Sequence, residues 1–439
     1  MQAFATEIML WGSRVGAVTW NPEQNYAFFE YDAAFLESKI QLAPLTMPLR
    51  REIFSFPELS FETFHGLPGM LADSLPDKFG SRLIDEWLVR TGRDPSSFSP
   101  VERLCYLGSR GMGALEFRPA LRENLGGSMP LQIAELVELA DAVLAKKQHL
   151  NTSFKNSSQE DTEAIRDILR VGTSAGGARA KAVIAWNEKT GEVRSGQVKA
   201  PAGFGYWLIK FDGVSENRDK ELNDPKGFGK VEYVYSKMAR EAGIEMSDCR
   251  LFHEHGRSHF MTRRFDRTST GQKIFMQTLC GIAHMDFNQA GAYSYEQAMD
   301  VAQKLGLPKK ALEQLFRRMV FNVLGRNQDD HTKNISFLMN KAGIWSLAPA
   351  YDLTYNYNPD GAWTHQHQMS INGKRDNFVP ADFHAVSKRF NIATPAQTDL
   401  LIEEIEHALS QWKRLAREVK VPEKMIDQIA CNCRIRSFS

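Results

Sequence analysis

The chain has 439 residues, a formal net charge of +1, five cysteines and 43% hydrophobic residues. This length predicts two or three domains, and the balanced charge argues against a broad basic surface that would bind nucleic acid directly. The odd number of scattered cysteines argues against a disulfide framework. The sequence has no signal-peptide pattern and no run of about 18 apolar residues, so we expect a cytoplasmic protein that does not enter a membrane.

The first third of the sequence has strand patterns followed by helical patterns. Residues 5–50 alternate between apolar and polar side chains around a turn at 21–25, which predicts a small antiparallel sheet. Residues 61–146 are mostly helical in pattern, and they include an amphipathic stretch at 130–147. We predict that residues 1–130 form the first domain.

The middle of the chain alternates between strand and helix patterns. It begins after a polar stretch at 149–164, and a second polar segment interrupts it at 215–230. We predict that residues 131–270 form the second domain. Its expected elements are a Gly-rich turn leading into a strand, a second strand, a helix and a β-hairpin, at 171–187, 201–213, 231–244 and 248–267.

Helical patterns predominate from about residue 275 onward. In the strongest one, at 308–327, apolar residues recur with i, i+3, i+4, i+7 spacing, and we expect its Arg317 and Arg318 on the solvated side. Two strands follow, the second ending in PAYDL, and a helical tail begins at about 396. We predict a mostly helical third domain at 271–439, and therefore an α+β fold class.

A cluster of polar residues directly follows the long helix, in the stretch LGRNQDDHTKNISFL at 324–338. Asp329 precedes Asn334 by five positions, the spacing of the protein-kinase catalytic loop, where the Asp takes the substrate proton and the Asn holds Mg²⁺. Asp352 follows where a kinase has its second metal ligand, and Lys333 can neutralise charge on a transferred phosphoryl group. The alternative is a capped turn with solvated polar groups.

Three upstream features match the same chemistry, and each also has a plain structural alternative. The Gly-rich segment 172–181 lets backbone N–H groups approach a phosphate, but a simple hairpin turn has the same composition. Lys210 lies in an apolar strand, as the nucleotide-binding lysine of kinases does, or else it extends to solvent at a sheet edge. Glu232 on the next helix is its candidate partner, or else a solvated helix residue.

In these motifs the chain resembles the HipA family of bacterial Ser/Thr kinases, the toxins of HipBA toxin–antitoxin modules. The family's catalytic stretch D-G-H-x-K-N corresponds to residues 329–334, its metal segment P-x-Y-D to 349–352, and its strand-lysine segment I-I-K-x to 208–211. Looser matches are the phosphate loop S-x-A-G-A-Q-x-K, the hinge E-R-F-D-R and the N-terminal segments S-L-P-L and N-L-L-P-D-S, at 174–181, 263–267, 45–49 and 71–77.

This resemblance implies a two-domain, protein-kinase-like fold that uses ATP and Mg²⁺. It implies Asp329 as the catalytic base beside Lys333, with Asn334 and Asp352 as metal ligands. It also implies autophosphorylation of Ser174, which would inactivate the enzyme because negative charge on the phosphate loop repels ATP phosphates. The implied nucleotide-binding residues are Ala175, Gly176, Gly177, Ala178, Lys181, Lys210, Arg263, Phe265, His331, Asn334 and Tyr351, with Glu232 as a structural partner of Lys210.

The resemblance also implies partners. They are a helix-turn-helix antitoxin of HipB type and a protein substrate such as an aminoacyl-tRNA synthetase, with DNA reached mainly through the antitoxin. Two competing predictions remain: a small-molecule phosphotransferase of kinase-like fold, and a corepressor that acts with a helix-turn-helix partner. The long N-terminal region argues against the first, and the complete set of catalytic residue types argues against the second.

Three sites depart from the family pattern. Asp330 stands where the family has glycine, and it places a second carboxylate beside Asp329, although the kinase spacing favours Asp329 as the base. Arg179 and Ala180 replace glutamine and glutamate in the phosphate loop, and Arg263 replaces glutamate in the hinge. These departures remove no metal ligand, but they leave the identity of the substrate undetermined. The sequence offers no physical account of Asp330.

Overall fold

The computed structural model describes residues 5–119, 133, 136–137, 179–215 and 227–435. Ser174 and the four implied nucleotide-binding residues that follow it lie outside the described residues, as does most of the predicted helix at 130–147. Among the helices that the structure describes, none is both long enough and apolar enough to cross a membrane.

The N-terminal subdomain contains an antiparallel sheet with strand order β4-β3-β2-β1-β5. The sheet shows that the mostly helical prediction for 61–146 is wrong at β5, because Leu115 and Phe117 alternate into the core and Phe117 pairs with Ile8. The strands are β1 (Ala5–Leu10), β2 (Ser13–Asn21), β3 (Tyr26–Tyr31), β4 (Ile53–Phe54) and β5 (Leu115–Arg118).

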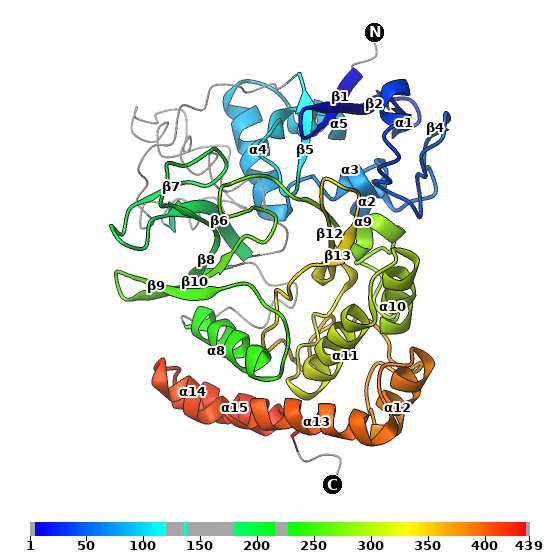
Figure 1. Ribbon diagram of the computed structural model, residues 1–439. Helices are drawn as coiled ribbons and strands as arrows, with labels where there is room; N and C mark the ends of the chain where they lie inside the picture. Colours follow the sequence, from blue (N-terminus) through cyan, green and yellow to red (C-terminus); the bar gives the residue numbers. More distant parts are fainter. Residues whose placement is uncertain (1–4, 120–132, 134–135, 138–178, 216–226, 436–439) are drawn as a thin grey trace.

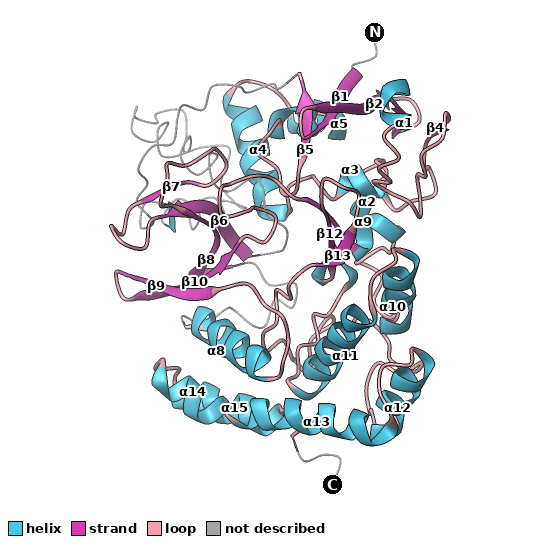
Figure 2. Ribbon diagram, in the orientation of Figure 1, coloured by secondary structure: helices cyan, strands magenta, loops and turns pink. Residues whose placement is uncertain are grey.

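Helices connect these strands, and α4 extends to the second sheet (Figures 1 and 2). They are α1 (Ala33–Leu36), α2 (Phe61–Phe64), α3 (Gly69–Ala72), α4 (Lys78–Arg90), the 3-10 helix η1 (Pro95–Ser97) and α5 (Pro100–Leu107). Phe79 and Leu83 of α4 belong to an apolar cluster with Ile184 and Trp207 of the second sheet. The first subdomain therefore covers part of the second.

The second sheet has the strand order β7-β6-β8-β10-β9, with antiparallel pairing throughout. The predicted strands, helix and hairpin of this region are confirmed, and β8 occupies the centre of the sheet, with α8 packed against β8 and β10. The elements are β6 (Arg179–Trp186), β7 (Val193–Ser195), β8 (Gly205–Ser215), α8 (Phe228–Glu241), β9 (Cys249–Glu254) and β10 (Arg257–Arg263).

The C-terminal region is mostly helical and contains one small antiparallel sheet with the order β11-β12-β13. Its strands are β11 (Phe275–Thr278), β12 (Ser336–Met339) and β13 (Trp345–Leu347), so the last predicted strand stops before PAYDL. Its helices are α9 (Leu279–Ala283), α10 (Tyr295–Lys304), α11 (Lys309–Leu324), the 3-10 helix η3 (Thr332–Asn334), α12 (Pro380–Arg389), α13 (Pro395–Ser410), α14 (Trp412–Glu418) and α15 (Glu423–Asn432). The predicted α+β class is confirmed.

The N-terminal subdomain is fixed directly to the C-terminal helices. One apolar core runs from the first sheet through α8 to α11. At the contact between α3 and α9, a Cβ added to Gly69 would lie 2.2 Å from the carbonyl oxygen of Gly281. Next to this contact, Asp73 Oδ2 accepts a hydrogen bond from the backbone N–H of Thr278 at 2.6 Å. A close backbone approach therefore joins two regions that the sequence separates widely.

We predict that Gly69→Ala destabilises the protein, because the obstructing atom is backbone and cannot rotate away. Overpacking of this kind costs about 1–3 kcal/mol, and the midpoint of thermal unfolding should fall accordingly. Gly111→Ala is the matched control, since a Cβ added to Gly111 meets no atom within 4 Å. Equal midpoints for the two variants would contradict the close contact.

Candidate active site

The predicted catalytic loop lies between α11 and β12, and it is closed by hydrogen bonds of its own residues. Asn334 Nδ2 donates to the carbonyl oxygen of Asp329 at 2.8 Å. Thr332 Oγ1 donates to the carbonyl oxygen of Met285 at 2.7 Å, which ties the loop to the segment after α9. Asp330 and Thr332 are buried, so the alternative of a turn with solvated polar groups does not describe this loop.

Lys210 lies on β8, the central strand of its sheet, and is only 8% exposed. Its Nζ lies 2.6 Å from Oε1 of Glu232 on α8 and also contacts Oδ1 of Asp352. The edge-of-sheet alternative for Lys210 and the solvated alternative for Glu232 are therefore wrong. Because a buried charge requires counter-charges, this triad holds β8, α8 and the loop after β13 together.

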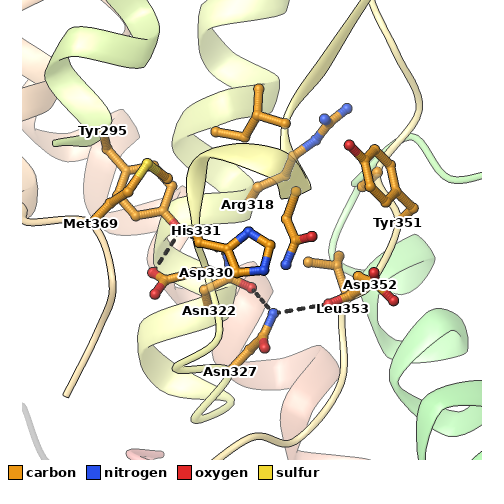
Figure 3. A pocket seen from close by; sticks show the side chains of 13 residues that line it. Tyr295, Arg318, Asn322, Asn327, Asp330, His331, Tyr351, Asp352, Leu353 and Met369 are labelled. Atoms are coloured by element: carbon orange, nitrogen blue, oxygen red, sulfur yellow. Dashed lines mark hydrogen bonds between the residues drawn. The ribbon is translucent and has the colours of Figure 1, made fainter. Parts of the chain in front are cut away.

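A pocket adjoins Asp352 (Figure 3). Asp352 has a φ of +54°, in the left-handed region that costs energy for residues other than glycine. Asn327 Nδ2 donates to its carbonyl oxygen at 3.3 Å, which helps to hold this conformation. Asp352 and Asn334 both line the pocket, and carboxylate and amide oxygens are hard ligands of the kind that Mg²⁺ prefers. These residues fit a Mg²⁺ ion.

Two of the implied nucleotide-binding residues belong to or contact the catalytic loop: His331 is part of it, and Tyr351 packs against it. The Tyr351 hydroxyl donates to the carbonyl oxygen of Lys333 at 2.5 Å, and burial raises the pKa of this tyrosine, which keeps the hydroxyl a donor. The Tyr351 ring lies 5.5 Å from the ring of Phe265, centroid to centroid. His331 Nε2 lies 3.8 Å from Asp329 Oδ1.

Lys181 lies next to Lys210, because the pairing of β6 with β8 places these two residues opposite each other. Lys181 is 2% exposed, and its Nζ lies 3.7 Å from Oδ2 of Asp77. Burial lowers the pKa of Lys181 and raises the pKa of Asp77 to about 6, against the attraction between the two groups. Asp77 also caps α4 by accepting from the N–H of Gly80 at 2.7 Å. The N-terminal subdomain thus places a carboxylate at the candidate site.

Lys333 packs against Phe287, in the segment after α9. Its Nζ is 4.5 Å from the ring centroid of Phe287. Burial raises the pKa of Asp73, and the positive charge of Lys333 opposes this rise, as it does at Asp77. Two carboxylates of the first subdomain are therefore close enough to Lys333 to interact with its charge.

The predicted hinge at 263–267 begins at the last residue of β10. Arg263 is exposed, whereas Arg264 and Asp266 are buried. Burial alone would raise the pKa of Asp266, but the guanidinium groups of Arg264 and Arg267 hold it well below its usual range. This buried ion cluster ties the residues of the hinge together, whereas Arg263 remains on its solvent side.

Besides Asp77, sequence reasoning missed Trp363 and Arg318 at the site. Trp363 Nε1 donates to Asp329 Oδ1 at 2.6 Å, and no motif indicated it. The prediction that Arg318 is solvated is wrong, because this side of α11 is buried: Arg318 is 4% exposed, lines the pocket and donates to the carbonyl oxygen of Ala348 at 2.8 Å. Its position three residues after Leu315, on the apolar face, was the available signal.

Comparisons with known proteins agree with this architecture. A family model described as the HipA-like C-terminal domain matches residues 173–413, and a model described as the HipA N-terminal domain matches residues 6–118. The chain belongs to the HipA family. The HipA fold is also found in the Shewanella oneidensis MR-1 toxin–antitoxin complex of HipA, HipB and operator DNA, with a TM-score of 0.65 and 17% identity over 99% of this chain and 98% of that chain. A comparison with curated proteins finds no match.

In this HipA-family chain, the structure brings most of the described candidate residues around one loop. Lys210, Glu232 and Asp352 are in direct contact. Asp329 and Asn334 share the catalytic loop. Lys181 lies opposite Lys210, and His331 and Lys333 belong to the catalytic loop. Tyr351 lines the pocket and packs on Phe265. Arg263 is not part of this group, because it is exposed at the end of β10 and lies 3.8 Å from Asp248.

We predict that Glu232→Gln lowers the stability of the folded protein by about 3 kcal/mol or more, because breaking a buried ion pair leaves a charge less well compensated. The midpoint of thermal unfolding is the measurement. Glu241→Gln, an exposed substitution on the same helix, is the control and should change the midpoint little. Similar shifts for both variants would argue against a dominant role of the triad in stability.

Proposed function

We propose that this chain is an ATP- and Mg²⁺-dependent serine/threonine protein kinase of HipA type, the toxin of a toxin–antitoxin pair. The observation that carries the proposal is the contact of Lys210 with both Glu232 and Asp352. In protein kinases a strand lysine binds the nucleotide phosphates and pairs with a helix glutamate, and an Asp after the catalytic loop holds Mg²⁺. The same residue types occur here in the same chain order.

The chemistry follows from these side chains. Asp352 and Asn334 would hold Mg²⁺, which neutralises charge on the phosphates of ATP. Asp329 accepts the proton of the substrate hydroxyl, whose oxygen bonds to the γ-phosphorus while the bond to the β-phosphate oxygen breaks and ADP leaves. Lys333 neutralises charge on the transferred phosphoryl group. Each of these roles belongs to a residue on or beside the catalytic loop.

We propose Ser174 as the site of autophosphorylation, with the phosphate loop at 174–181 binding ATP through its backbone. The support is the placement of Lys181, the last residue of this loop, which lies on β6 opposite Lys210. About two negative charges on Ser174 would repel the phosphates of ATP. Autophosphorylation would thus switch the kinase off.

We propose a helix-turn-helix antitoxin of HipB type as partner and a protein of translation, such as an aminoacyl-tRNA synthetase, as substrate. The support for the partner is the Shewanella oneidensis structure, in which HipA is in complex with HipB and operator DNA. The net charge of +1 favours DNA contact mainly through the antitoxin. A substrate of this kind places the activity in the cytoplasm.

We predict that the purified chain transfers phosphate from labelled ATP, in the presence of Mg²⁺, to Ser174 and to a protein of a cell lysate. Asp329→Asn should reduce transfer by at least about 100-fold, the usual contribution of a general base, and Asp352→Asn should also reduce transfer and raise the Mg²⁺ concentration that the remaining activity requires. Scintillation counting measures the transfer, and mass spectrometry locates the phosphate.

Asp427→Asn is the control for this assay, because Asp427 forms an exposed ion pair with Lys413. It should retain the transfer rate of the wild type. Equal labelling by wild type and Asp329→Asn would overturn the kinase proposal, and transfer to a sugar or an antibiotic instead of protein would favour a small-molecule phosphotransferase.

For the partner, we predict that the chain alone does not retard a duplex DNA fragment at about 0.15 M salt. If a small helix-turn-helix protein is encoded next to this chain, a mixture of the two proteins should elute as one complex and retard the operator. Retardation by the chain alone would contradict indirect DNA contact, and separate elution would contradict the antitoxin proposal.

A further inference from the structure

Asp330, the second carboxylate of the catalytic loop, is buried in a polar network (Figure 3). Its Oδ2 accepts from the hydroxyl of Tyr295 at 2.8 Å and lies 2.8 Å from Nδ1 of His367, and its Oδ1 accepts from the backbone N–H of Gln368 at 2.8 Å. Burial and the nearby carboxylate raise the pKa of Tyr295 well above its usual value, so its hydroxyl remains a donor. Three groups thus hold one buried carboxylate.

Two of these three groups belong to the segment 363–368, which follows Asp352 in the chain. Gln368 Nε2 donates to the carbonyl oxygen of Trp363 and, at 3.1 Å, to the carbonyl oxygen of Gln328 in the catalytic loop. Arg375 Nε donates to the carbonyl oxygen of His367 at 2.6 Å and braces the segment from its far end. The side chain of Asp330 therefore fixes the backbone that carries Trp363.

Trp363, which this segment carries, in turn contacts the catalytic loop. Its indole N–H donates to Oδ1 of Asp329 at 2.6 Å, a short hydrogen bond to a carboxylate. A hydrogen bond to one oxygen restricts rotation of the carboxylate and therefore sets the direction of the other oxygen. The two adjacent acidic residues have different environments, since Asp330 is 1% exposed and the side chain of Asp329 is 35% exposed.

We propose that Trp363 is a positioning residue that orients the carboxylate of Asp329, with Oδ2 directed to the substrate hydroxyl, and that Asp330 holds Trp363 in place. The inference rests on the proposed function, because Asp329 needs an orientation only if it accepts a proton. It assigns a role to Asp330, whose side chain anchors the segment 363–368 through His367 and Gln368.

The contact itself is tested without any enzyme assay. Indole N–H resonances of ¹⁵N-tryptophan-labelled protein are recorded, and the Trp363 signal is assigned by its loss in Trp363→Phe. Asp329→Asn and Asp330→Asn should each shift the Trp363 signal and leave the Trp11 signal in place, because the Trp11 indole donates to the carbonyl oxygen of Lys273, away from this site. An unchanged Trp363 signal in both variants would overturn the inference.

The functional arm uses the Mg²⁺–ATP assay on the full chain. Trp363→Phe keeps a ring and removes the donor, so kcat should fall about 10- to 100-fold, while KM for ATP stays within about twofold. In an Asp329→Asn background the same change should have no further effect, since both act on one proton transfer. Trp11→Phe, which also removes an indole hydrogen bond, should retain the wild-type kcat.

The two failures are distinguishable. A wild-type protein that transfers no phosphate overturns the proposed function, and the role of Trp363 in catalysis with it. If the wild type is active, two outcomes overturn the inference alone. One is an unchanged kcat in Trp363→Phe. The other is that Trp363→Phe lowers kcat by the same factor in the Asp329→Asn background as in the wild type. Full activity with an intact Trp363 signal in Asp330→Asn would remove Asp330 from the proposal.

Discussion

The buried ammonium group of Lys210 is the constraint on which the candidate site depends. A lysine at the centre of a sheet is unfavourable unless carboxylates compensate its charge, and the two that do so come from α8 and from the loop after β13. Three elements that are distant in the sequence must therefore meet at one point. The left-handed backbone of Asp352 is tolerated because this meeting point and the hydrogen bond from Asn327 over-determine its position.

A second polar network extends this constraint through the C-terminal helices. Tyr295, which contacts Asp330, also accepts from Asn322 Nδ2 at 2.8 Å, and Asn322 Oδ1 accepts in turn from Asn327 Nδ2 at 2.9 Å. Because Asn327 reaches the carbonyl of Asp352, hydrogen bonds connect the catalytic loop to the predicted metal ligand through the interior. A buried network of this kind favours one arrangement, since a slip would leave further polar groups unpaired in the core.

Local patterns in the sequence were enough to predict the α+β class, the second sheet with its helix and hairpin, and α11, because periodicity reports which side of an element is buried. The same reasoning placed Lys210 and Glu232 as partners, since a lysine within an apolar strand needs a counter-charge. It failed at β5, where a short strand depends on pairing with β1, more than 100 residues away. It also gave no role to Trp363 or Asp77, because their contacts arise from tertiary packing, which produces no periodic pattern in the sequence.

The ion pair between Asp77 and Lys181 has a consequence for how such chains diverge. The two charges are buried, they belong to segments matched by different family models, and burial opposes the charged form of each. A chimera can take the N-terminal segment from one family member and the C-terminal segment from another. Its buried charges would compensate each other only if both parents carry this pair of charges. Inheritance of the two segments is thus linked, and substitutions at positions 77 and 181 are expected to be correlated among relatives.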